Sequence, residues 1–290
     1  MKIEYRSTRL SEANMQRLVV INDIIKMYQS QGYSLTLRQL YYQLVSRDII
    51  PNKIQEYAKL STLLKEGRMG GLVDWAAIED RLRRPSSPSC WSSPAAILDV
   101  VASQFRVDRM EGQNTYIEVW VEKDALSGVL KRVTEKYGIP IVVNRGYSSA
   151  TAMHDAHQRF EQHEEQYTKV IYIGDFDPSG QDMIRDIAER INEFSGHNYN
   201  FDIIPIALTW EQIQQYTPPP NPAKITDPRA KEYIKKHGAT SWEVDALRPD
   251  VLNDILDKKI ISLIDIYRYN LRLILEEKGK KQLNALKSKL

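Results

Sequence analysis

Four short apolar runs, separated by stretches with helical periodicity, constrain the fold of this chain more than any other feature. The runs are TYIEVWV (115–121), IPIVV (139–143), KVIYIG (169–174) and FDIIPIAL (201–208). Helical patterns lie between them, around residues 124–137, 150–166 and 180–195. Strands that alternate with helices form mostly parallel sheets that are covered on both faces. The fold class is therefore expected to be α/β.

The residues before this alternating region show helical periodicity without the strand-like apolar runs. Helical stripes cover residues 11–31, a stretch that begins at Leu37, and a third stretch that ends near Gly67. The sequence RMGGLVDW (68–75) follows and is expected to form a short hairpin. Three short helices and a hairpin predict a winged helix-turn-helix, a shape that often docks on duplex DNA.

A Ser- and Pro-rich stretch, PSSPSCWSSP (85–94), separates the helical N-terminal region from the alternating region and predicts an exposed connection. A chain of 290 residues is long enough for two packed domains. We expect a winged-helix DNA-binding domain over residues 1–84, a linker over 85–113, and a sheet domain with a C-terminal helical extension over 114–290.

Composition narrows the class of protein. The chain is 42% hydrophobic, no segment approaches the roughly 20 apolar residues of a membrane span, and the N-terminus lacks a signal-peptide core. The single cysteine, Cys90, excludes an internal disulfide and a cysteine-rich zinc site. These features predict a cytoplasmic protein with no membrane partner. The net charge of +2 says little, but the basic runs RLRRP (81–85) and KGKKQLNALKSKL (278–290) are either phosphate-binding surfaces or solvated ones.

Three acids stand where strands of the predicted sheet end. Glu122 follows the first strand, and Asp175 and Asp177 follow the third. Parallel strands would bring all three to one edge, where they could share a cation. Oxygen ligands without nearby His or Cys favour Mg²⁺ over zinc, and the metal would neutralise charge on a phosphate.

Each acidic group also has an ordinary structural interpretation. The order Asp-Pro-Ser-Gly that begins at Asp177 is the preferred one for a type I turn. Glu243 and Asp245, near the C-terminus, either add a second metal position or are acids around the start of a helix.

Two adjacent tyrosines form a second candidate site. In LRQLYYQL, Tyr41 lies on the apolar stripe of a helix that Thr36 and Gln39 are expected to cap. Tyr42 projects from the flank, four residues after Arg38, so the guanidinium and the phenol are neighbours. A phenol with a pKa near 10 is a poor nucleophile, and an adjacent cation would favour phenolate. The alternative is ordinary cation–π packing.

These two motifs resemble a known family. VWVEKDA followed by YIGDFDPSG is similar to the Toprim domain, whose Glu and two Asp residues bind magnesium. An Arg-x-x-Tyr-Tyr helix placed before such a domain resembles the A subunit of DNA topoisomerase VI and its meiotic double-strand-break relatives, in a compact stand-alone version. The resemblance implies that Tyr42 attacks DNA beside Arg38, and that Glu122, Asp175 and Asp177 hold Mg²⁺. It also implies a homodimer, with any ATPase on a separate subunit.

The expected function is therefore Mg²⁺-dependent cleavage of double-stranded DNA by tyrosine transesterification. One alternative is a Toprim nuclease in which water replaces Tyr42 as nucleophile. Another is a catalytically silent module that binds DNA and recruits a partner. A phosphatase with an aspartate nucleophile is disfavoured, because PSG replaces the usual Thr after the second acid.

Overall fold

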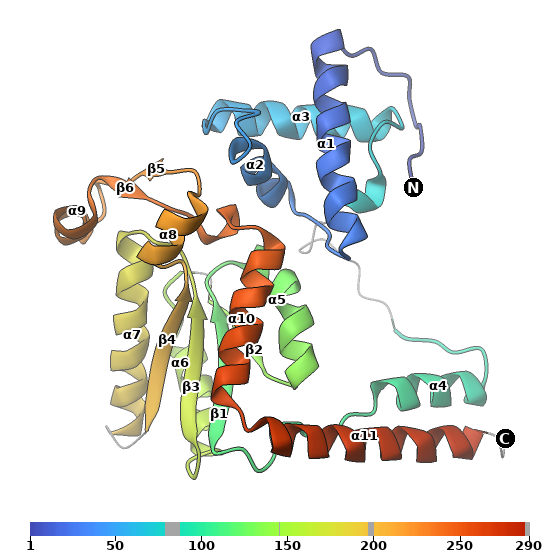
Figure 1. The fold of residues 1–290 in the computed structure, drawn as a ribbon, viewed down its shortest axis with the longest axis vertical. Helices are drawn as coiled ribbons and strands as arrows, with labels where there is room; N and C mark the ends of the chain where they lie inside the picture. Colours follow the sequence, from blue (N-terminus) through green and yellow to red (C-terminus); the bar gives the residue numbers. More distant parts are fainter. Residues whose placement is uncertain (79–87, 145, 197–199, 288–290) are drawn as a thin grey trace.

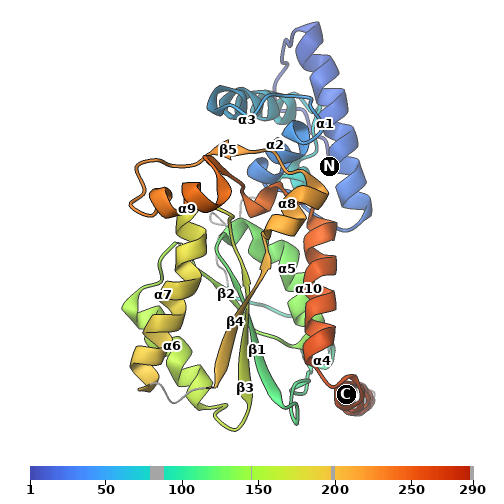
Figure 2. The same cartoon turned by 60° about the vertical axis from the view of Figure 1, so that its left-hand side comes forward.

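The computed structural model describes residues 1–78, 88–144, 146–196 and 200–287 (Figures 1 and 2). The domain boundary expected between residues 84 and 85 lies outside the described residues, as does the basic run at Arg81, Arg83 and Arg84.

The central feature is a four-stranded sheet in which every pairing is parallel, with the strand order β2-β1-β3-β4. Its strands are β1 (Thr115–Val121), β2 (Ile141–Val143), β3 (Tyr167–Ile173) and β4 (Phe201–Ala207). The register pairs Val121 with Ile173, so β1 and β3 end at the same level. The expected α/β class with a parallel sheet is confirmed.

Helices cover both faces of this sheet (Figures 1 and 2). One face packs against α5 (Asp124–Tyr137) and α10 (Pro249–Leu263), and the other against α6 (Ala150–Glu161) and α7 (Pro178–Ser195). Successive residues of a strand face opposite sides of its sheet, and both sides are dry here. Val119 and Trp120 are accordingly both fully buried, in different cores. This explains why the strands are continuous apolar runs.

The N-terminal unit consists of α1 (Glu12–Ser30), α2 (Leu37–Val45), α3 (Ile54–Met69) and the short η1 (Trp75–Ala77) around a core of their own. The three helices confirm the helical patterns. The capping box is also present, because the Thr36 side chain accepts from the Gln39 backbone and the Gln39 side chain accepts from the Thr36 backbone.

The hairpin expected at residues 68–75 is wrong. Helix α3 continues to Met69, and Gly70 then forms an antiparallel bridge with Glu4 rather than pairing within its own segment. The apolar residue Val73 packs fully buried among the three helices. Val73 therefore packs in the helical core instead of pairing within a hairpin. The winged-helix arrangement is not confirmed.

The expected linker is partly helical. Ser93 caps α4 (Pro94–Gln104), with Pro94 in the first turn, where proline is favoured. Helix α4 packs against the long C-terminal helix α11 (Ile266–Lys287), and the pair extends away from the sheet (Figure 1). Signals of an exposed connection at 85–94 thus also mark the start of a helix.

The remaining elements lie near the carboxyl ends of the strands (Figures 1 and 2). They are α8 (Trp210–Tyr216), β5 (Asn221–Pro222), α9 (Ala230–His237), β6 (Thr240–Ser241) and η2 (Val244–Ala246). The segment around η2 joins the two parts of the molecule, because Trp242 bridges to Phe176 beyond β3 while Ala246 packs in the N-terminal core. Helix α2 therefore lies close to the edge that carries the predicted acids.

Candidate functional site

The pairing of β1 and β3 continues past their ends and brings two of the predicted acids together. The backbone N–H of Glu122 donates to the Ile173 carbonyl at 2.9 Å. The backbone N–H of Asp175 then donates to Oε2 of Glu122, also at 2.9 Å. Glu122 and Asp175 therefore share one edge of the sheet, as the sequence predicts.

Asp177, the third predicted acid, begins helix α7. Its Oδ1 accepts from the Gly180 backbone at 2.6 Å and from the Ser179 hydroxyl at 2.9 Å, and Pro178 occupies the first helical turn. The Asp-Pro-Ser-Gly sequence thus acts as a helix cap. Only glycine fits at position 180, because a Cβ there would lie 2.3 Å from the Asp175 carbonyl oxygen.

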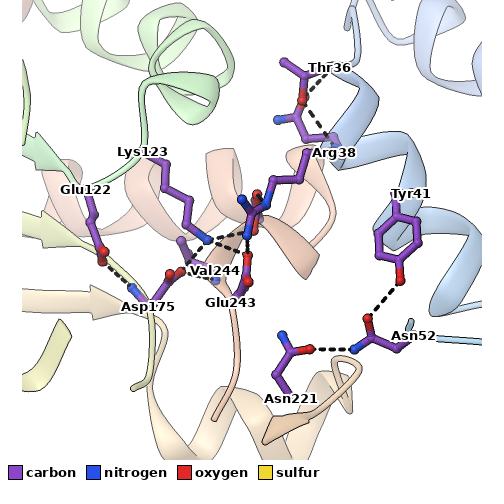
Figure 3. Close-up of polar contacts among 12 residues, drawn as sticks. Thr36, Arg38, Tyr41, Asn52, Glu122, Lys123, Asp175, Asn221, Glu243 and Val244 are labelled. Carbon is purple, nitrogen blue, oxygen red and sulfur yellow. Dashed lines mark hydrogen bonds and ion pairs between the residues drawn. The ribbon is translucent and has the colours of Figure 1, made fainter. Parts of the chain in front are cut away.

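Lys123 lies at the centre of a group of carboxylates (Figure 3). Its Nζ is 2.8 Å from Oδ1 of Asp175, 2.9 Å from Oε2 of Glu243 and 3.0 Å from Oδ1 of Asp245. Oδ1 of Asp175 also accepts from the Val244 backbone at 2.8 Å. The side chain of Asp175 therefore faces the lysine and the η2 segment.

Arg38 reaches the same group from helix α2 (Figure 3). Its Nη2 donates to Oε2 of Glu243, and its Nε lies 3.1 Å from Oδ2 of Asp245. We call Arg38, Lys123, Asp175, Glu243 and Asp245 the ion cluster. The ion cluster ties the N-terminal unit to the carboxyl edge of the sheet within one chain.

The ion cluster holds three carboxylates and two cations, and it is buried on its Asp245 side and exposed on its Arg38 side. The Asp245 side chain is fully buried, whereas 23% of the Glu243 side chain is exposed. Burial raises the pKa of Asp175 to about 7 against the opposing charge of Lys123, and burial likewise raises the pKa of Asp245. Burial also disfavours ionised Glu243, but Lys123 and Arg38 outweigh it and lower the pKa of Glu243 to about 2.

Tyr42 is the neighbour of Arg38 that the helical spacing predicts, with the guanidinium carbon 5.9 Å from the ring centroid. The flank from which Tyr42 projects is covered, because only 4% of Tyr42 is exposed and its ring packs edge-on against Tyr41. Burial raises the pKa of Tyr42, the charges of Glu243 and Asp245 raise it further, and Arg38 opposes them. Packing of the unit's core against the η2 segment covers the flank of α2.

Tyr41 is nearly as buried as Tyr42, but its surroundings differ. Its hydroxyl donates to Oδ1 of Asn52 at 3.0 Å and lies 3.2 Å from the Lys53 carbonyl. Asn52 in turn donates to Oδ1 of Asn221 at 2.8 Å (Figure 3). Tyr41 therefore has a structural role at the junction, whereas Tyr42 faces the ion cluster.

The magnesium site predicted at Glu122, Asp175 and Asp177 stays a prediction. Within the ranges that the structure describes, no three or more His, Cys, Asp or Glu side chains are arranged to hold a metal ion. Asp175 is engaged by Lys123. Among the described residues, Oε1 of Glu122 and Oδ2 of Asp177 make no hydrogen bond or ion pair. Burial raises the pKa of Glu122, and the charge of Asp177 acts in the same direction. Magnesium typically uses one or two carboxylates, and these two oxygens are of the ligand type that it prefers.

Sequence reasoning missed Lys123. The signal was the dipeptide that it forms with Glu122 at a strand end, but nothing in the sequence identified its partners. Glu243 and Asp245 were found, with two interpretations left open. The structure places both at the start of η2, where they bind Arg38 and Lys123.

Comparisons with known proteins add no family. No family model, no curated protein and no solved structure matches the chain. No helix within the described ranges has the length and apolar character needed to cross a bilayer.

Proposed function

We propose that this chain breaks double-stranded DNA by transesterification, with Tyr42 as the nucleophile. One observation carries the proposal: Arg38 and Tyr42 of helix α2 are held against the acidic carboxyl edge of the sheet by the ion cluster. The sequence resemblance to topoisomerase VI A subunits supports the same pairing of sites. Since one chain supplies both parts, a homodimer would serve to cut two strands rather than to complete one site.

The proposed step exchanges one phosphoester for another. The Tyr42 oxygen bonds to phosphorus, and the bond from phosphorus to one bridging deoxyribose oxygen breaks. The phenol proton leaves to water, and the released deoxyribose oxygen takes a proton. Arg38 stabilises both the phenolate and the charge that develops on the phosphate oxygens.

Glu122 and Asp177 are the residues that would hold Mg²⁺, which would supply positive charge to the phosphate. Asp175 lies beside them and orients Lys123 through its 2.8 Å ion pair. Binding to duplex DNA is expected to weaken with salt, because phosphate contacts release counterions. We further propose a cytoplasmic location, and a separate ATPase subunit for any ATP-driven strand passage.

A second candidate is a nuclease in which water attacks the phosphate. The burial of Tyr42 and its raised pKa favour this candidate, because both disfavour phenolate. For Tyr42 to attack, contacts between α2 and the η2 segment must loosen when DNA binds. A module that binds DNA without cutting it remains the third possibility.

The test uses supercoiled plasmid with Mg²⁺ or Mn²⁺, quenched with detergent and analysed with and without protease. Transesterification gives protein-linked ends, and Tyr42→Phe is expected to reduce them by at least about 10³-fold. The matched control is Tyr41→Phe, which removes a hydroxyl from the neighbouring buried ring and should keep cleavage within about threefold. Free ends that survive Tyr42→Phe indicate the nuclease, and binding without breakage indicates the silent module.

A further inference from the structure

In the ion cluster, two cations share one carboxylate oxygen. Neither a metal site nor an ion pair that only joins two parts of a chain requires this arrangement. One oxygen, Oε2 of Glu243, is shared by the guanidinium of Arg38 and the ammonium of Lys123. These two cations come from different parts of the molecule, from α2 and from the end of β1 (Figure 3). A carboxylate oxygen bound by an arginine and a lysine has the surroundings that proteins give to a phosphate oxygen.

We propose that Arg38 and Lys123 form a phosphodiester-binding subsite and that Glu243 is an internal occupant of it, displaced when DNA binds. This proposal rests on the proposed function, because it names where the DNA phosphate would sit in that same site. It assigns Lys123 to phosphate binding and makes Glu243 an autoinhibitory residue.

Charge supports the exchange. A phosphodiester carries one negative charge, as does the Glu243 carboxylate. Replacing one by the other leaves the charge balance of the ion cluster unchanged. Placing DNA there without displacing Glu243 would instead add another negative charge to a partly buried group.

Burial identifies Glu243 as the removable acid. Its side chain is 23% exposed, compared with 10% for Asp175 and 0% for Asp245. Asp175 is also anchored by the Val244 backbone N–H. Glu243 precedes η2, and its side chain makes no capping hydrogen bond there. It can therefore leave the two cations without breaking a helix cap.

The location of the subsite agrees with the proposed chemistry. Arg38 lies over the Tyr42 ring, and the charge of Glu243 is close enough to Tyr42 to raise the pKa of its hydroxyl. A phosphate at the position of Glu243 would thus be close to the proposed nucleophile. Movement of Glu243 would also loosen the ion pair that holds the η2 segment to α2.

The experiment measures binding without cleavage. The full-length protein is titrated against a fluorescent 20-base-pair duplex in EDTA, and anisotropy gives the dissociation constant. Glu243→Gln is expected to bind about tenfold more tightly, the change expected when an internal ligand that occupies a site about nine-tenths of the time is removed. Its slope of log Kd against log salt should also steepen by up to about 0.9, because one more phosphate contact then releases counterions.

Glu277→Gln is the matched control, since it removes one negative charge from an exposed position on α11. It should bind within about twofold of the natural protein. Adding Lys123→Gln to Glu243→Gln should abolish the gain in affinity. Circular dichroism verifies folding, and if Glu243→Gln does not fold, Glu243→Asp, which shortens the side chain but keeps the charge, should show a smaller gain.

Equal affinity of folded Glu243→Gln and Glu277→Gln would overturn the proposal, as would a gain that persists without Lys123. These outcomes are separate from the plasmid test. A protein that never breaks DNA but binds it more tightly as Glu243→Gln has the subsite without the transesterase activity. A protein that forms Tyr42-linked ends while Glu243→Gln gains nothing has the activity without the masked subsite.

Discussion

Two buried ion groups of this protein differ in how their charges balance. On one face of the sheet, the fully buried Glu118 receives the Tyr116 hydroxyl, the Trp120 indole N–H and two nitrogens of Arg159, at 2.7–3.0 Å. One carboxylate there meets one cation, and four donors satisfy its oxygens. The ion cluster at the carboxyl edge instead sets three carboxylates against two cations. Oδ2 of its fully buried Asp245 pairs with Nε of Arg38 at 3.1 Å but receives no hydrogen bond from the described residues.

The difference indicates two purposes. A balanced, fully hydrogen-bonded ion pair holds a structure together and has no capacity for another ion. An unbalanced cluster is costly to fold, and such arrangements are typical of sites that bind a ligand or exchange one. The comparison therefore supports the proposed function at the carboxyl edge and a structural role for Glu118.

The largest effect is expected from Lys123→Met. Removing the ammonium leaves Asp175, Glu243 and Asp245 facing one another with only Arg38 to balance them, and the free energy of unfolding should fall by about 4–5 kcal/mol. Urea unfolding at pH 7 measures this. Lys131→Met, at an exposed position on α5, is the control and should change stability by less than about 0.5 kcal/mol. A Lys123 variant as stable as the natural protein would mean that the acids are not held by the lysine.

The next largest effect is expected from Glu118→Gln, which disrupts the balanced ion pair with Arg159. It leaves Arg159 without its partner and replaces an acceptor oxygen with a donor, so stability should fall by about 3 kcal/mol. The proposed DNA cleavage, measured per folded molecule, should be unchanged, because the hydrogen-bond partners of Glu118 are not members of the ion cluster. Urea unfolding measures the loss of stability, and the plasmid assay at low temperature measures cleavage. Full stability combined with lost cleavage would contradict the structural role.

The smallest effect concerns pH and the ion pair of Glu276 with Arg109, at 2.7 Å, which Lys280 joins at the same distance. Hydrogen bonding to Arg109 lowers the pKa of Glu276 to about 2 from an ordinary value of 4.5. A lowered carboxyl pKa contributes stability that is present above pH 4.5 and is lost as pH falls through 2. The contribution of this pair should be about 2 kcal/mol. Urea midpoints measured from pH 5 to pH 2.5 should fall more steeply for the natural protein than for Glu276→Gln, because only the natural protein loses this contribution. Parallel curves would contradict it.

Local signals predicted much of this fold. The apolar runs located the four strands of the central sheet, and the Thr36–Gln39 capping box marked the start of α2. These predictions succeeded because strand burial and helix capping depend on residues close together in the chain. The hairpin at 68–75 failed because α3 continues to Met69 and Val73 packs into the core shared by α1, α2 and α3.

For the site, the sequence by itself determined which groups stand at strand ends and which phenol lies beside Arg38, since the strand and helix periods fix those positions. Only the tertiary structure decided that Lys123 forms an ion pair with Asp175, that Glu243 and Asp245 complete the ion cluster, and that Tyr42 is buried. The physical reason is that charge balance and burial depend on contacts between residues as far apart as Arg38 and Glu243, which are 205 positions apart in the chain. No local pattern encodes such contacts.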